Sequence, residues 1–248
     1  MKTVAIFSIK GGTGRTSVAC NLGAELTQQG RRCTVVDGDP QNSLGLHLGM
    51  AVGERFGLGR HDLTSHDIAR HQRGLTKVSY LPFGQCSFEE LLEVERSSVE
   101  NYAWLDERLH RLLPPGTEIA LIDLPAGARG WTYHVLSGAD LVLAVLLADA
   151  ASYSTLPVTE ELLSRCGARH VAYLVNAMDA RLPLSVDVRA AMNVVVGKSL
   201  LPFTMPADEA MREAFAQQKT VQEHAPDSQA AFAFGELGDW VQSVLRDE

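Results

Sequence analysis

The sequence contains few cysteines, no excess of basic residues and no apolar run of membrane-spanning length. Its four cysteines, Cys20, Cys33, Cys86 and Cys166, show neither C-x-x-C nor zinc-ligand spacing, so we interpret them as small buried thiols. The longest uninterrupted apolar stretch, residues 141–148, is too short for a transmembrane helix, and the N-terminal apolar run is too short for the core of a signal peptide. These absences predict a cytoplasmic protein with reduced thiols.

Basic residues are outnumbered: 22 Lys and Arg stand against 30 Asp and Glu, which gives a net charge of −8 and a pI near 5.5. This balance argues against a chain whose main partner is DNA or an anionic lipid surface, since both attract clustered positive charge. With 46% hydrophobic and 21% charged residues over 248 positions, the chain can bury one sizeable core. We therefore expect a single domain over residues 1–248.

Short apolar runs alternate with stretches that have helical spacing. The apolar runs predict strands at residues 3–9, 33–37, 77–84, 119–125, 140–149, 170–178 and 198–206. Helical spacing predicts helices at residues 17–30, 88–113, 208–218 and 228–246. Strands that are apolar throughout are typical of a parallel sheet covered on both faces. The pattern predicts a doubly wound α/β fold with a mostly parallel sheet.

Residues 49–76 interrupt this alternation with many glycine, arginine and histidine residues. The histidines in and beside this segment lack the cysteine or carboxylate spacing of a metal site: they are His47, His61, His66 and His71. We interpret the segment as a solvated polar insertion with one short helix. A surface for a partner, next to a bound nucleotide, is the alternative.

The first predicted strand is followed by a glycine-rich loop, KGGTGRT, at residues 10–16. Gly11, Gly12 and Gly14 would let the backbone approach a phosphate closely, and the following helix would present its positive end. Thr16 stands where the motif G-x-x-x-x-G-K-[ST] places a hydroxyl on Mg²⁺, but Arg15 replaces the lysine of that motif. A tight turn without a ligand is the alternative interpretation.

Two other predicted strands end in acidic residues. Asp37 and Asp39 follow the strand at 33–37, and Asp123 closes the strand at 119–125. A carboxylate at Asp37 or Asp39 could orient or polarise an attacking water, while Asp123 resembles a Walker-B carboxylate that supports Mg²⁺. Because the carboxyl ends of parallel strands share one edge of the sheet, we expect these groups to lie beside the glycine loop. An ordinary Asp-Gly turn is the alternative at Asp37.

Taken in order, the motifs K-G-G-x-G-[K/R]-T, D-x-D-P-Q and D-x-P-A-G resemble those of the MinD/ParA class of deviant Walker-A ATPases, over nearly the whole chain. The resemblance implies a P-loop protein that binds ATP and Mg²⁺ and forms a homodimer around the nucleotide. It implies that Lys10 reaches the partner's nucleotide, that Asp39 helps activate water, and that Asn176 recognises adenine. Its implied Mg²⁺ site consists of Thr16, Asp37 and Asp123. The expected nucleotide-contacting residues are Gly11, Gly12, Thr13, Gly14, Arg15, Thr16, Ser17, Asn176, Pro206 and Asp208.

Within that class, residues 81–90, 121–128 and 208–231 resemble the branch that serves cellulose biosynthesis. This resemblance implies accessory proteins of the cellulose synthase complex as partners and recruitment to the inner membrane or cell pole through them. The alternatives are a ParA-like partition ATPase that binds DNA and a MinD-like positioning ATPase. The first would need a basic surface, and the second a basic amphipathic C-terminal helix, which residues 235–248 do not provide.

We expect Arg15 to affect the rate of ATP hydrolysis more than the binding of the nucleotide. Arginine keeps the positive charge of the usual lysine but presents a longer, planar group. Losing one well-aimed electrostatic contact costs roughly 3 kcal/mol of transition-state stabilisation. We therefore hypothesise that the loop binds nucleotide and that hydrolysis is slow.

Overall fold

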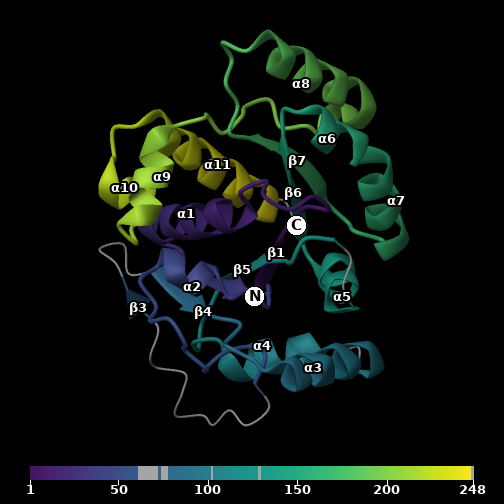
Figure 1. The fold of residues 1–248 in the computed structure, drawn as a ribbon, viewed down its shortest axis with the longest axis vertical. Helices are drawn as coiled ribbons and strands as arrows, with labels where there is room; N and C mark the ends of the chain where they lie inside the picture. The colour runs from purple at the N-terminus through teal and green to yellow at the C-terminus, as the bar shows by residue number, and fades with distance from the viewer. Residues whose placement is uncertain (61–71, 74–77, 102, 128–129, 247–248) are drawn as a thin grey trace.

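The computed structural model describes residues 1–60, 72–73, 78–101, 103–127 and 130–246. Its centre is a sheet with the strand order β3-β4-β2-β5-β1-β6-β7 (Figure 1). All neighbouring strands are parallel except β3, which pairs antiparallel with β4. The strands are β1 (Lys2–Phe7), β2 (Cys33–Asp37), β3 (Gln72–Arg73), β4 (Val78–Leu81), β5 (Ile119–Asp123), β6 (Leu141–Leu147) and β7 (Val171–Asn176).

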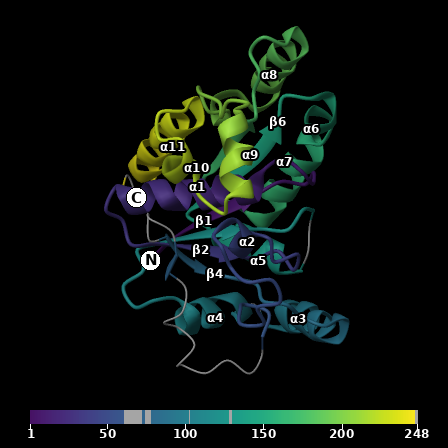
Figure 2. The same cartoon turned by 60° about the vertical axis from the view of Figure 1, so that its left-hand side comes forward.

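Helices cover both faces of the sheet, as the turned view also shows (Figure 2). One face packs on α1 (Arg15–Gln28), α2 (Leu44–His47), α9 (Glu209–Ala216), α10 (Val221–His224) and α11 (Gln229–Arg246). The other packs on α3 (Phe88–Glu100), α4 (Trp104–Leu112), α5 (Gly130–Gly138), α7 (Leu156–Cys166) and α8 (Pro183–Val196). The short helices α6 (Ala150–Ser154) and η2 (Gly197–Ser199) complete the described elements. The predicted doubly wound α/β fold is therefore confirmed.

Alternate residues of each central strand enter the two cores. Val4 and Ile6 of β1 face the α1 side, while Ala5 and Phe7 face the opposite side, and all four are fully buried. This two-sided burial is the reason that the strands are apolar throughout. Among the described residues, no helix is both long and apolar enough to cross a lipid bilayer.

The predicted seventh strand at residues 198–206 is wrong. This segment passes through η2 and then runs beside β7. Leu200 forms an isolated bridge with Tyr173 of β7, and Pro206 forms one with Met178, just beyond the end of β7. The backbone N–H groups of Leu201 and Met205 donate to β7, but Pro202 and Pro206 have no N–H to give. A continuous ladder cannot form where proline removes a donor, so the apolar run stays irregular.

The single helix predicted at residues 88–113 is also wrong, because the chain forms two helices, α3 and α4, around Asn101. Asn101 has an extended backbone with φ −120° and ψ 104°. Its side-chain oxygen accepts a hydrogen bond from the backbone N–H of Ala103, 2.9 Å away. Such local side-chain bonding competes with helical hydrogen bonds, and periodicity alone does not reveal it.

Of the polar insertion at residues 49–76, the structure describes residues 49–60 and 72–73, and the short helix expected there is not found in that part. Residues 57–59 pair with the segment after β4: the N–H groups of Leu58 and Gly59 donate to the carbonyls of Pro82 and Phe83, both at 2.8 Å. Leu58 is fully buried. This part of the insertion is therefore packed into the core on the α3 side. The positions of His61, His66 and His71 lie outside the described residues.

Candidate nucleotide site

The glycine-rich loop connects β1 to α1 and depends on two left-handed residues. Gly12 has φ +74° and Gly14 has φ +87°, conformations that side chains disfavour. Gly14 is the N-cap residue of α1. Having no side chain, it leaves the first backbone N–H groups of that helix open to an anion. A Cβ atom at Gly14 would lie 2.3 Å from Nδ2 of Asn176, so glycine is also required by space.

The two strand-end carboxylates predicted to support a metal lie side by side. Asp37 and Asp123 are paired residues of the adjacent strands β2 and β5, and both are buried. Burial, followed by the charge of Asp123, raises the pKa of Asp37, although backbone N–H groups of Asp39 and Leu44 donate to it. Burial raises the pKa of Asp123 to about 7. Two buried acids held together are costly without a cation.

Thr16 adds a hydroxyl to this acidic pair. Its Oγ1 donates to Oδ2 of Asp123 at 2.6 Å. The second oxygen of Asp123, Oδ1, is buried and has no hydrogen-bond partner among the described residues, and the same holds for Oγ1 of Thr13 in the loop. Buried polar atoms are normally satisfied, so these oxygens are available to a ligand at the loop. Oxygen donors of this kind fit Mg²⁺.

Arg15 is folded beneath the loop and is only 8% exposed. Its Nη1 donates to the carbonyl of Ser8 at 3.3 Å, and its Nη2 lies 4.0 Å from Oδ2 of Asp39. The predicted phosphate-binding cation and the predicted water-activating acid therefore face each other.

Lys10 contacts its own chain in this structure. Its Nζ lies 2.5 Å from Oδ2 of Asp149, the residue that caps α6. The other oxygen of Asp149 accepts from the backbone N–H of Ser152. Sequence analysis missed Asp149, although an aspartate directly after a strand and before a helix is a common capping signal.

The residues predicted near the base line one pocket of 270 Å³ at the end of the loop. Asn176, Pro206 and Asp208 border it together with Gly14 and Ser17. In this structure Nδ2 of Asn176 donates to the carbonyl of Thr13 at 2.8 Å. Both oxygens of Asp208 accept backbone N–H groups, from Ala210 and Ala230, so Asp208 shapes the pocket wall.

Sequence reasoning missed other parts of this pocket, including Met211 and Arg212 from α9. Both face the pocket because Asp208 starts α9 directly after the loop at residues 200–207, and only the fold shows that direction. Among the described residues, no group of three or more His, Cys, Asp or Glu forms a self-sufficient metal site. A cation here would therefore need phosphate or water oxygens besides Asp123 and Thr16.

The site combines a glycine loop, two paired strand-end acids and the pocket predicted for the base, all at the carboxyl edge of a parallel sheet. This combination defines a P-loop protein of the MinD/ParA class. The septum-site protein MinD of Pyrococcus horikoshii, solved with Mg-ADP, has a similar fold with a TM-score of 0.79 and 23% identity, covering 97% of this chain and 95% of that one. The chromosome-partitioning ATPase Soj of Thermus thermophilus is 26% identical over 256 residues, covering 100% of this chain and 98% of Soj.

Within this class the family is defined more closely. The profile of the cellulose biosynthesis protein BcsQ family matches residues 1–242. The BcsQ protein of Escherichia coli K12 is 30% identical over 243 residues, covering 97% of this chain and 94% of that protein. The chain belongs to the BcsQ family.

Proposed function

We propose that this chain binds Mg–ATP in the site between the glycine loop, Asp123 and the base pocket, and hydrolyses it slowly. The observation that carries the proposal is the placement of Arg15, which lies under the loop against Asp39. The loop retains its glycine geometry, so it can still bind phosphate. Catalysis depends on positioned charge, and both charged groups are turned toward each other.

The residues fit the proposed ligand. Backbone N–H groups at Gly12–Thr16 would hold the phosphates, and Oδ1 of Asp123 with Oγ1 of Thr16 would hold the cation, directly or through water. Bound Mg²⁺ would neutralise charge on the phosphates and on the buried acids. Adenine would occupy the 270 Å³ pocket, where Asn176 would exchange its bond to Thr13 for one to the base.

We further propose that two copies join around the nucleotides, as the MinD/ParA resemblance implies. Lys10 would then leave Asp149 and reach the partner's phosphates. The pair with Asp149 is partly exposed, with side-chain exposures of 25% and 42%, so it stores roughly 1 kcal/mol or less. Contacts to a phosphate of the partner can exceed that amount.

Family membership supports a role in cellulose biosynthesis, the process for which this family is named. We propose that the ATP-bound dimer assembles or localises the cellulose synthase machinery through accessory proteins, and that it works at the inner membrane by way of those partners. The net charge of −8 supports a protein partner over DNA.

The test compares ATP binding and phosphate release in the full chain and in the variant Arg15→Lys. We expect the full chain to bind Mg–ATP and Arg15→Lys to release phosphate about a hundredfold faster. Arg165→Lys, on the exposed surface of α7, is the matched control and should change neither measurement. Equal turnover in the full chain and Arg15→Lys would contradict slow hydrolysis, and failure to bind ATP would contradict the nucleotide function itself.

The cellular role needs a separate measurement. We expect the chain to copurify with the cellulose synthase from cells that make cellulose, and to do so less when Asp123→Asn prevents cation binding. DNA binding that depends on ATP and falls steeply with salt would favour the partition alternative instead.

A further inference from the structure

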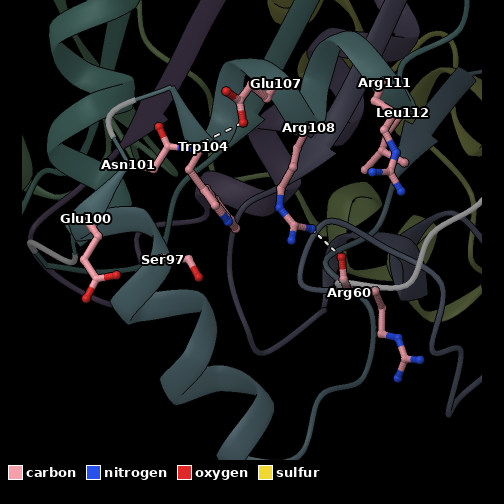
Figure 3. A pocket seen from close by; sticks show the side chains of 9 residues that line it. All are labelled: Arg60, Ser97, Glu100, Asn101, Trp104, Glu107, Arg108, Arg111 and Leu112. Atoms are coloured by element: carbon pink, nitrogen blue, oxygen red, sulfur yellow. Dashed lines mark hydrogen bonds between the residues drawn. The ribbon is translucent and has the colours of Figure 1, made fainter.

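A second cavity, of 390 Å³, lies on the opposite side of the sheet from α1, between α3, α4 and Arg60 (Figure 3). Ser97 and Glu100 of α3 border it, together with Trp104, Arg108 and Arg111 of α4. None of these residues belongs to the candidate nucleotide site. In Figures 1 and 2, α3 and α4 lie in the lower part of the view, away from α9.

The indole of Trp104 is the unusual group in this cavity. Trp104 is 6% exposed, and its Nε1 is buried without an acceptor among the described residues. Figure 3 shows the ring pointing toward Arg108 in the middle of the cavity. Buried indole N–H groups normally find a partner, as Trp131 does with the carbonyl of Gly38 at 3.0 Å. The Trp104 N–H is therefore a donor that a ligand in the cavity could satisfy.

Positive charge surrounds that donor. The guanidinium carbon of Arg108 lies 4.7 Å from the centre of the Trp104 ring. Arg108 is fixed there, because its Nη1 donates to the carbonyls of Leu58, at 2.6 Å, and Arg60. Burial, followed by the charge of Arg111, lowers the pKa of Arg108. An anion bound between Arg108 and Arg111 would stabilise the charged form of Arg108 against its burial and against the charge of Arg111.

Two acids limit how much negative charge the cavity can accept. Glu100 and Glu107 lie on its border, and Oε2 of Glu107 accepts from Nδ2 of Asn101 at 3.3 Å. Arg60 is itself paired with Glu90, whose Oε1 lies 2.9 Å from its Nη1. With Glu100 and Glu107 also on the border, the lining has little net positive charge, so it favours a ligand with a single anionic group.

We propose that this cavity binds a small molecule through one oxyanion group, a phosphate or a carboxylate. An oxygen of that group accepts the hydrogen bond of the Trp104 indole, and its charge lies among Arg60, Arg108 and Arg111. Arginine suits both kinds of oxyanion because its planar fork matches their geometry. The proposal does not depend on ATP binding at the glycine loop.

The test observes the indole N–H signals of the full-length protein, labelled with ¹⁵N at its three tryptophans, during titration with inorganic phosphate or with acetate. Trp104→Phe identifies the signal of Trp104. We expect that signal to move downfield and saturate with at least one of the two anions, and the anion that saturates it more tightly identifies the class of oxyanion. Trp131, which bonds the loop at Gly38, separately reports any phosphate bound at the nucleotide site.

A second experiment removes the positive charge of Arg111. In Arg111→Gln the anion should bind about tenfold more weakly, since a charge-assisted hydrogen bond is lost, while ATP binding stays unchanged. Arg165→Gln, on exposed α7, is the control and should leave the titration as it is in the unmodified chain. The proposal is overturned if neither anion gives a saturable shift of Trp104, or if Arg111→Gln binds as tightly as the unmodified chain.

Discussion

The indole N–H of Trp131 donates to the carbonyl of Gly38, and this bond joins the two acidic loops of the candidate site. Gly38 lies between Asp37 and Asp39, while Trp131 stands at the start of α5, the next described element after the loop that follows Asp123. Position 38 has no room for a side chain, because a Cβ there would lie 2.9 Å from the carbonyl oxygen of Asp123. The backbone N–H of Gly38 also donates to that carbonyl at 2.8 Å. Gly38 thus ties the segments after β2 and β5 together through both its N–H and its carbonyl.

Replacing Trp131 by Phe should lower the free energy of unfolding by about 1–3 kcal/mol for the hydrogen bond, in addition to the loss of ring volume. The buried carbonyl of Gly38 would lose its partner. Denaturant unfolding measures the change. Trp104→Phe is a matched control, since Trp104 is also buried but its N–H has no protein partner among the described residues. Equal losses in both variants would show that the Trp131 hydrogen bond contributes nothing.

Asp123→Asn should raise the stability of the ligand-free protein and abolish its stabilisation by Mg–ATP. Asp123 and Asp37 are buried acids on paired strands, so removing one charge relieves desolvation and repulsion, by on the order of 1–2 kcal/mol at neutral pH. The hydroxyl of Thr16 can still donate to the amide oxygen. Thermal unfolding with and without Mg–ATP measures both effects. Asp106→Asn, an exposed acid on α4, should change neither, and a destabilised ligand-free Asp123→Asn would contradict this account.

Asp149→Asn should increase the fraction of dimer at a given ATP concentration. Asparagine can still cap α6 through Ser152, but it no longer holds Lys10 by charge. Each copy releases one such pair, worth less than roughly 1 kcal/mol, so the two pairs together should change the dimerisation constant by up to about thirtyfold. Analytical sedimentation of the unmodified chain and of Asp149→Asn, each with ATP, measures the fraction of dimer. Asp140→Asn breaks a different ion pair, with Lys2, and should leave the dimer fraction unaltered.

His47 should make the protein less stable in mild acid. It stacks on Phe215 with ring centres 3.7 Å apart, and burial lowers its pKa from 6.5 to about 4. The unfolded chain therefore takes up this proton first, and stability falls as the pH drops from about 6.5 toward 4. We expect a loss of about 1 kcal/mol between pH 7 and pH 5, discounted for partial exposure. In His47→Phe, which keeps a stacked ring, this part of the pH dependence should disappear; an identical pH profile in both proteins would exclude His47 as its source.

The positions of the strand-end acids could be predicted because short sequence motifs contain them. Asp37 and Asp123 follow apolar runs directly, and the rule that parallel strands end at one edge brings them together. By contrast, Lys10 and Asp149 are separated by 139 residues, and no local pattern joins them. The partner of Trp131 was hidden for the same reason, since the contact depends on how α5 packs.

The errors in the fold came from local features that periodicity does not register. Residues 198–206 are apolar enough for a strand, but Pro202 and Pro206 interrupt its donors. Helical spacing continues through residue 101, yet the side chain of Asn101 ends α3. In both places one or two residues outweighed the pattern of their neighbours.

The irregular segment beside β7 has a consequence for solubility during folding. A long free strand edge can pair with another molecule and begin an aggregate. Here residues 200–207 cover the β7 edge, and their prolines lack the N–H groups that a strand from another molecule would need for a complete ladder. The opposite edge of the sheet is the two-residue strand β3. Within the part of the chain that the structure describes, neither end of the sheet offers a long edge to a further strand. The prolines that prevented a seventh strand therefore also protect the β7 edge against edge-to-edge association.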